Sequence, residues 1–288
     1  MKFYAKFFLF CSISVAFVSF LWRGPSFNEE SLKGARVLVT GASTGIGEQL
    51  SYHYARLGAQ LVITARRANV LEQVVNKCLE LGAQKALFIP ADMSNPSDAE
   101  MVVQNAIEKL GGLDFLVLNH IGPSPYKMWD GDIEHIRWLL QVNFLSYAQM
   151  AKKALPTLEK SKGSIVVVSS LLGKMCNPYA VPYATTKFAL NGFFGTLQHE
   201  LAMQGSNVSV TICILGLIDT ESAMEKIKGY INMTAYPAHD AAWHIIEAGA
   251  LRQSESFYPF YTYYATLFRD WFPYYRDLAI RNSYTYNP

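Results

Sequence analysis

From residue 36 onward, short apolar runs alternate with longer amphipathic stretches. Runs such as Ile165-Val166-Val167-Val168 consist of β-branched residues, which is typical of strands that are buried on both faces. Strands that alternate with helices predict a doubly wound α/β fold, in which helices flank a parallel sheet. The expected strands cover residues 36–40, 60–65, 86–90, 114–118, 164–169 and 208–214. The expected helices cover residues 45–57, 69–81, 97–110, 132–158 and 181–204.

The N-terminal segment has a different pattern. Lys2 and Lys6 precede an uncharged, mainly apolar run over residues 7–22, which Arg23 closes. Its 16 residues lie between the roughly 7 to 15 of a signal-peptide core and the roughly 17 to 25 of a spanning helix, so length leaves both interpretations open. We favour an uncleaved anchor, because the small-residue triplet Ser14-Val15-Ala16 is followed by more apolar residues.

The charges around this run predict where the protein resides. Two lysines before the run and one arginine after it favour a cytoplasmic N-terminus and a luminal body. The glycosylation sequons that begin at Asn207 and Asn232 are compatible with a glycoprotein in that compartment. We therefore expect a protein of the endoplasmic reticulum membrane with a luminal folded domain. Secretion after signal-peptide cleavage is the alternative.

These patterns divide the chain into three segments. Residues 1–24 form the signal-anchor or signal peptide, residues 34–256 form a single α/β domain, and residues 257–288 form an aromatic-rich tail. Eleven of the twenty residues at 257–276 are aromatic. Such side chains suit boundaries between apolar and wet surroundings, so we expect the tail to contact a membrane surface, a second subunit, or both. The alternative is that these rings close the core over a pocket.

Composition narrows the possible ligands. A chain of 288 residues with 51% hydrophobic content can bury one large core. The net charge of +2, without a Lys/Arg cluster, leads us to expect no nucleic-acid partner. The histidines are scattered, and the four cysteines lack the spacing of a zinc site or a disulfide framework, so we expect no metal.

A glycine-rich turn follows the first expected strand and opens the first expected helix. Glycines there allow a tight turn and close approach of a pyrophosphate, while the helix N-terminus offers free N–H groups to the anion. The second expected strand ends at Arg66 and Arg67, where no carboxylate can bind a ribose 2'-hydroxyl and arginine suits a 2'-phosphate. The pattern therefore predicts NADP(H) binding in a Rossmann-type domain, unless both arginines are only solvated. The turn comprises Gly41, Ala42, Ser43, Thr44, Gly45, Ile46 and Gly47.

A second motif places a phenol and an ammonium group together. Tyr183 and Lys187 are four residues apart and so share one face of an expected helix. Positive charge from Lys187 and from oxidised nicotinamide is expected to favour the Tyr183 phenolate, whose ordinary pKa is near 10. Tyr183 would then be the general acid of carbonyl reduction or the general base of alcohol oxidation. Ser170 lies thirteen residues earlier, just after the fifth expected strand.

Together these motifs resemble the short-chain dehydrogenase/reductase family. The resemblance implies that Tyr183, Lys187, Ser170 and Asn143 are catalytic, and that Tyr183 and Lys187 also contact the cofactor. Ser170 and Tyr183 would bind the reacting oxygen of the substrate, and Asn143 would help to hold a proton-relay water. His120 is expected to have a structural or cofactor-lining role and not to act as a base. The remaining cofactor contacts that the resemblance implies are Asp92, Met93, Asn119, His120, Ile121, Gly216, Leu217, Ile218, Asp219, Thr220 and Ser222.

Within the family, the sequence is most similar to 11β-hydroxysteroid dehydrogenases of type 1 and their 1-like relatives. The similarity rests on Asn119-His120-Ile121 and on Leu215, which replaces the usual family proline, and it fades after about Ser254. It implies NADP(H)-dependent interconversion of a hydroxyl and a ketone on a small lipophilic substrate, with cortisol/cortisone as the best guess, in a homodimer. The alternatives are a reductase of other lipophilic carbonyls or retinoids, and a non-catalytic NADP-binding membrane scaffold.

Overall fold

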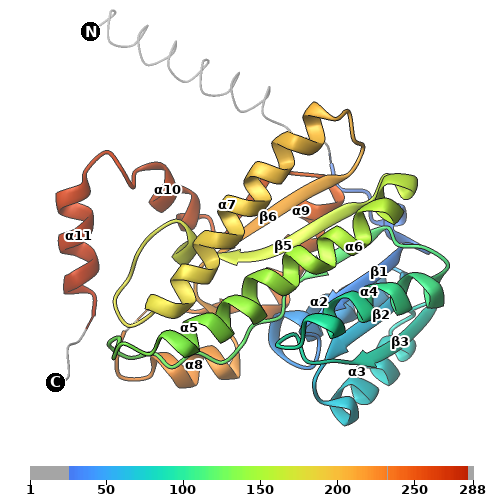
Figure 1. Cartoon of the computed structure of the whole chain (residues 1–288), viewed down its shortest axis with the longest axis horizontal. Coiled ribbons are helices and arrows are strands. Elements are labelled where there is room, and N and C mark those ends of the chain that lie inside the picture. The colour runs from blue at the N-terminus through green and yellow to red at the C-terminus, as the bar shows by residue number, and fades with distance from the viewer. Residues whose placement is uncertain (1–25, 232, 285–288) are drawn as a thin grey trace, which may run out of the picture.

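Seven parallel strands form the central sheet, in the order β3-β2-β1-β4-β5-β6-β9 (Figure 1). The computed structural model describes residues 26–231 and 233–284. The strand order reverses between β1 and β4, which both pair with their neighbours in parallel. Two short strands, β7 and β8, form a separate parallel pair. The strands are β1 (Arg36–Thr40), β2 (Gln60–Ala65), β3 (Lys85–Pro90), β4 (Phe115–Leu118), β5 (Ser164–Ser170), β6 (Ser209–Leu215), β7 (Ile218–Asp219), β8 (Tyr236–Pro237) and β9 (Glu255–Tyr258).

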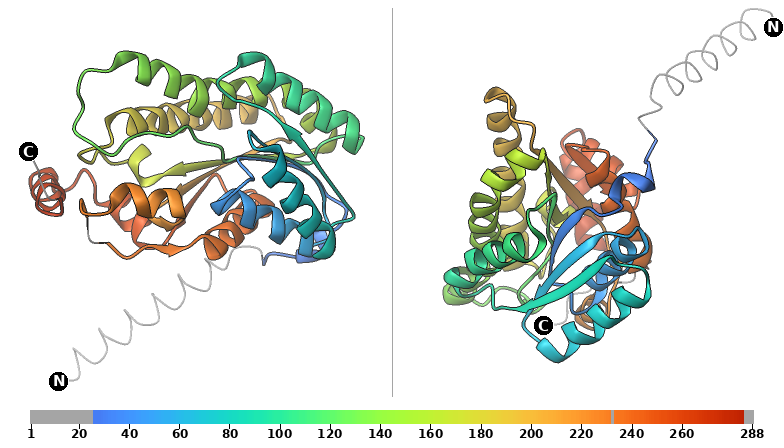
Figure 2. Two further views of the ribbon diagram at one scale, coloured as in Figure 1. Left: turned by 90° about the horizontal axis from the view of Figure 1, so that it is seen from below. Right: turned by 90° about the vertical axis from the view of Figure 1, so that its right-hand side faces the viewer.

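Helices cover both faces of the sheet (Figure 2). Buried side chains of α4, α6 and α7 pack on one face, and those of α2, α3 and α9 pack on the other. The helical segments are η1 (Glu29–Leu32), α2 (Gly45–Arg56), α3 (Ala68–Glu80), α4 (Pro96–Leu110), α5 (Ile133–Leu140), the π-helical η2 (Gln141–Leu145), α6 (Ser146–Ser161), η3 (Leu171–Gly173), α7 (Val181–Met203), α8 (Glu221–Ile227), α9 (Ala238–Ala250), α10 (Tyr261–Leu267) and α11 (Pro273–Asn282).

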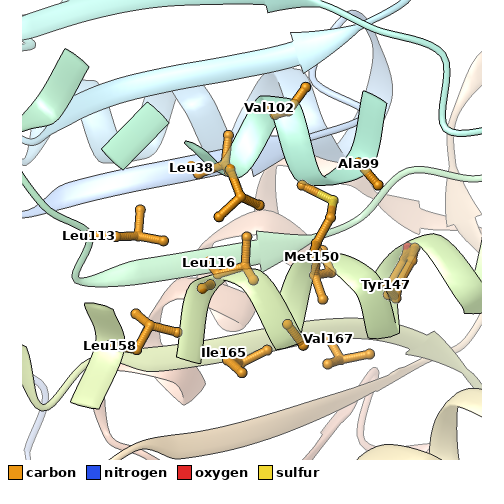
Figure 3. Packing of buried hydrophobic residues seen from close by; sticks show 14 of the residues in the cluster. Leu38, Ala99, Val102, Leu113, Leu116, Tyr147, Met150, Leu158, Ile165 and Val167 are labelled. Atoms are coloured by element: carbon orange, nitrogen blue, oxygen red, sulfur yellow. The ribbon is translucent and has the colours of Figure 1, made fainter. Parts of the chain in front are cut away.

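The core between the sheet and the first helical layer explains why the strands are apolar throughout. Leu38, Leu116 and Ile165 project from three neighbouring strands toward helix residues that include Val102 and Met150 (Figure 3). All five side chains are fully buried. The alternate residues of the same strands, among them Val37 and Val166, are buried against the opposite layer. Both faces of each strand are therefore removed from water, as the continuous apolar runs predicted.

The structure confirms the predicted α/β architecture, but several predicted element boundaries differ from the observed ones. All six expected strands are present, and their ends differ from the expected ends by at most one residue. The single helix expected over residues 132–158 is instead three segments, α5, η2 and α6. β9 and α9 were not predicted at all, although β9 forms one edge of the sheet.

The expected anchor, residues 1–24, lies outside the described residues. None of the helices in the described part of the chain is long and apolar enough to cross a membrane. The expected tail begins within β9, continues through α10, and ends in α11, which lies apart from the sheet (Figures 1 and 2). α11 has no buried residue. Large apolar side chains are exposed along this tail, including Phe260, Phe268, Trp271, Phe272, Tyr274 and Tyr275.

Candidate active site

Two adjoining cavities lie at the carboxyl ends of the strands, beside the point where the strand order reverses. Ligands bind at this place in open α/β sheets. The larger cavity has a volume of about 570 Å³ and is lined by the glycine-rich turn and by the ends of β2 and β3. The smaller has a volume of about 280 Å³ and lies against the end of β5 and the start of α7. The two cavities share Ile46, Asn119, Ile121, Thr220, Ser222 and Lys226 in their linings.

The glycine-rich turn is held by close backbone contacts. Gly41 and Gly45 have φ values of 65° and 61°, in the left-handed region that favours glycine. A Cβ atom on Gly47 would lie 2.1 Å from the carbonyl oxygen of Gly41. Ser43, Thr44, Gly45 and Ile46 line the larger cavity with Gly41, whereas Ala42 and Gly47 are buried behind the turn. The glycines therefore serve the predicted turn and the close packing of α2.

Arg66 and Arg67, which follow β2, belong to the same cavity. Both side chains line it, together with Asp92 and Met93 from the loop after β3. The Arg67 guanidinium donates a hydrogen bond of 3.3 Å to the Ser43 hydroxyl, so it is drawn toward the glycine-rich turn. The described residues thus bring the two predicted cofactor motifs to one cavity.

His120 is a buried structural residue. Its Nε2 lies 3.0 Å from the carbonyl oxygen of Val142, which can only accept, so Nε2 donates. Its Nδ1 lies 2.8 Å from the Thr40 hydroxyl. Burial lowers the pKa of His120 to about 3, so the imidazole is neutral at physiological pH. These contacts support the expectation that His120 is no catalytic base. Its neighbours Asn119 and Ile121 line both cavities.

Ser170, Tyr183 and Lys187 converge on the smaller cavity. Ser170 is the last residue of β5 and Tyr183 lies in the first turn of α7. The Ser170 side chain hydrogen-bonds to the Tyr183 phenol. The Lys187 ammonium lies 5.5 Å from the centre of the Tyr183 ring and donates a hydrogen bond of 2.8 Å to the carbonyl oxygen of Val168. A phenol, a hydroxyl and a buried amine thus meet in one apolar-walled pocket.

Burial shifts the pKa values of both Tyr183 and Lys187. Burial raises the pKa of Tyr183 to about 12, although its hydrogen bond with Ser170 acts in the opposite direction. Burial also lowers the pKa of Lys187 to about 7. Burial thus dominates the pKa of both groups in the protein alone, and the expectation that Lys187 together with oxidised nicotinamide favours the phenolate stays a prediction.

Asn143 does not line either cavity. Its Oδ1 accepts a hydrogen bond of 2.7 Å from the Gly122 N–H, and its Nδ2 donates one of 3.2 Å to the Thr186 hydroxyl. The side chain therefore joins the loop after β4 to α7, one residue before Lys187. Both ends of the amide thus contact protein groups, and the expectation that Asn143 helps to hold a relay water stays a prediction.

The segment after β6 contacts both cavities. Gly216, Leu217, Ile218, Thr220 and Ser222 line the smaller cavity, and the last two also line the larger one. Thr220 lies against the glycine-rich turn, since its Cγ2 would be 3.0 Å from a Cβ atom on Gly45. Asp219 is exposed and lines neither cavity, so its predicted cofactor contact has no support in the geometry.

Tyr126 and Tyr284, which line the smaller cavity, were missed from the sequence. Tyr126, Asn177 and Tyr284 meet at the smaller cavity, where the Asn177 amide donates a hydrogen bond of 2.6 Å to the Tyr284 hydroxyl. Lys226, which lines both cavities, was also missed. No local pattern marks these residues, because they lie in loops or on a short helix. Among the described residues there is no cluster of side chains able to hold a metal ion.

Comparison with known proteins defines the class of this protein. A family model described as short chain dehydrogenase matches residues 35–231, and the chain belongs to this family. It is 81% identical over 288 residues to the Hydroxysteroid 11-beta-dehydrogenase 1-like protein of Danio rerio, with all of both chains covered. It is 49% identical over 234 residues to the protein of that name from Homo sapiens, covering 81% of this chain and 74% of the human one.

Solved structures share the fold. A short chain dehydrogenase from Burkholderia cenocepacia J2315 in complex with NADP superimposes with a TM-score of 0.70 at 27% identity, covering 78% of this chain and 96% of the other. A short chain dehydrogenase/reductase from Burkholderia phymatum in complex with NAD gives a TM-score of 0.74 at 19% identity, covering 89% and 98%. The second likeness establishes the fold alone.

Proposed function

We propose that this protein is an NADP(H)-dependent oxidoreductase that interconverts a hydroxyl and a ketone on a steroid. The observation that carries the proposal is the convergence of Ser170, Tyr183 and Lys187 on a cavity that adjoins the glycine-rich turn. The names of the relatives support a hydroxysteroid substrate, and cortisol/cortisone is the best single guess.

The residues of the larger cavity fit an NADP molecule. The N-terminus of α2 and the open glycine-rich turn suit a pyrophosphate, and Arg66 and Arg67 suit the ribose 2'-phosphate. The NADP complex of the Burkholderia cenocepacia relative supports this choice of cofactor. When bound, the nicotinamide supplies the hydride acceptor or donor.

In the direction of reduction, Tyr183 donates its phenolic proton to the carbonyl oxygen of the substrate. A pKa of about 12 keeps this proton in place at neutral pH, so the residue is poised as a general acid. Ser170 donates a hydrogen bond to the same oxygen and polarises the carbonyl. Lys187 stands behind the phenol, and its amine can carry positive charge as the phenolate forms. The apolar walls suit a lipophilic substrate, which would displace water from this step.

The proposal is tested with the purified protein, NADPH or NADP+, and a panel of steroids, retinoids and simple ketones in both directions. Turnover of an 11-ketosteroid or an 11β-hydroxysteroid well above that of the other compounds supports the steroid assignment. Preference for retinoids or simple ketones supports the alternative lipophilic-carbonyl reductase. Cofactor binding without any turnover supports the scaffold alternative and contradicts the proposal.

We further propose that residues 7–22 hold the protein in the endoplasmic reticulum membrane with its catalytic domain in the lumen. The charge order around that run motivates this location, and the exposed aromatic side chains of residues 257–284 are suited to a membrane or homodimer contact. An anchored chain resists carbonate extraction, retains its N-terminus and is protected from protease in sealed microsomes. Release into the medium after cleavage, or cytosolic exposure of the domain, contradicts this location.

A further inference from the structure

Lys226 is a cation without a partner at the place where the two cavities join. It lies on α8, its side chain is half-buried, and it lines both cavities together with Thr220 and Ser222. No hydrogen bond or salt bridge to any described residue satisfies its ammonium group. The neighbouring carboxylate of Glu225 raises the pKa of Lys226, but burial dominates and lowers it. A half-buried, unpaired charge is unfavourable unless a ligand supplies the opposite charge.

The position of Lys226 indicates which anion it meets. Thr220, at the start of α8, lies directly against Gly45 of the glycine-rich turn. Lys226 and Ile46 both line the two cavities, so the ammonium group shares the junction with the first turn of α2. The N-terminus of a helix attracts anions. The α2 N-terminus and Lys226 thus present positive charge to the same junction from two separate elements.

The other cations of the larger cavity do not line the smaller cavity, so they are not shared by the two. Among the described lining residues these cations are Arg66 and Arg67, which follow β2 and line only the larger cavity. Lys187 lies in the smaller cavity, where its ammonium already donates to the carbonyl oxygen of Val168. Lys226 is therefore the cation best placed for an anion at the junction.

We infer that Lys226 binds the pyrophosphate of the dinucleotide and thereby fixes α8 over the cofactor. This inference rests on the proposed function, because it takes the larger cavity to be the dinucleotide site. α8 contains no buried residue, so a ligand contact can contribute a large part of what holds this helix in place. Both NADPH and NADH carry the pyrophosphate, so Lys226 contributes to the affinity for both.

The test compares Lys226→Met with Lys226→Arg and with Lys228→Met, an exposed lysine on the same segment that lines neither cavity. Dissociation constants for NADPH and NADH are measured by fluorescence on the full-length protein. Lys226→Met is expected to raise both constants by about tenfold and to a similar extent, since a charge-assisted contact to phosphate is lost. Lys226→Arg is expected to recover most of the affinity, and Lys228→Met to match the wild type.

A second readout follows α8 itself. A protease specific for glutamate cuts after Glu221 and Glu225, which all three variants retain. Saturating NADPH is expected to slow this cleavage in the wild type and in Lys228→Met, but much less in Lys226→Met. Unchanged dissociation constants together with unchanged protection overturn the inference. So does an effect of Lys226→Met that is confined to the KM of the lipid-like substrate, which would assign the lysine to the substrate. Absence of NADPH binding by the wild type instead refutes the proposed function.

Discussion

Substitution of Gly47 by alanine tests whether close packing of the glycine-rich turn shapes the cofactor site. The added Cβ atom would lie 2.1 Å from the Gly41 carbonyl oxygen and 2.6 Å from the Asn119 amide nitrogen. The Gly41 backbone has little room to retreat, because Gly41 itself packs against His120. The turn, the loop after β4 and the start of α2 must therefore separate.

Two opposing effects set the change in the free energy of unfolding that Gly47→Ala causes. Overpacking of this kind costs about 1–3 kcal/mol. Replacement of glycine by alanine within a helix gains at most about 1 kcal/mol, and less than that here because Gly47 lies in the first turn of α2. We expect a net loss of up to about 3 kcal/mol, which corresponds to a melting temperature lower by up to about 12 °C in a domain of this size. The distorted turn is also expected to weaken NADPH binding by at least about tenfold.

The assay is thermal unfolding by circular dichroism, combined with NADPH titration by fluorescence. Gly192→Ala is the matched control, since Gly192 lies within α7 and no heavy atom would lie within 4 Å of its added Cβ. The control is expected to gain about 0.5–1 kcal/mol and to keep its NADPH affinity. If Gly47→Ala melts and binds NADPH like the wild type, the turn tolerates a side chain and this reasoning is refuted.

Three further outcomes are expected. Arg67→Ala raises the dissociation constant of NADPH at least about tenfold and that of NADH less than about threefold, because only the 2'-phosphate contact is lost; equal weakening would contradict this role. Burial lowers the pKa of Lys187 from its ordinary 10.5 to about 7 in the folded protein. The charged amine therefore destabilises the fold in full below pH 7, and this loss of stability disappears as the pH rises to 10.5. Stability by urea unfolding therefore rises between pH 7 and 9 by up to about 1.4 kcal/mol per unit relative to Lys187→Met, and parallel profiles would refute this. Because burial raises the pKa of Tyr183 to about 12, kcat/KM for alcohol oxidation increases up to about tenfold per pH unit between pH 7 and 9, while a flat profile would exclude Tyr183 as the base.

The parts of the fold that sequence predicted are those with a local pattern. β1 and β2 were placed to the residue because both faces of each strand are buried, and an apolar run ends where burial ends. β9 was missed because Glu255-Ser256-Phe257-Tyr258 has no apolar run and forms only an edge of the sheet. The break at η2 was missed for another reason: the carbonyl of Val142 accepts a hydrogen bond from His120, and no helical periodicity records that contact.

The site residues that the sequence predicted are likewise those marked by a local pattern. Tyr183 and Lys187 were found because the helix sets their spacing, and Ser170 because it ends a recognisable strand. The contact between Asn177 and Tyr284 joins residues that are 107 positions apart, so only the folded chain reveals it. The rise in the pKa of Tyr183 could not be predicted, because a sequence gives the neighbouring charge but not the depth of burial.

Replacement of Tyr183 by phenylalanine tests the central claim most directly. Phenylalanine retains the ring in the smaller cavity and removes only the phenolic hydroxyl, so NADPH affinity and the melting temperature are expected to stay near wild-type values. Tyr264→Phe, on the exposed face of α10, is the matched control and should retain full activity. The decisive measurement is kcat/KM for the best ketone of the panel with NADPH. Tyr183→Phe is predicted to lower it by about 10² to 10⁴-fold, and retention of more than about a tenth of the wild-type value would contradict the assignment of Tyr183 as the general acid.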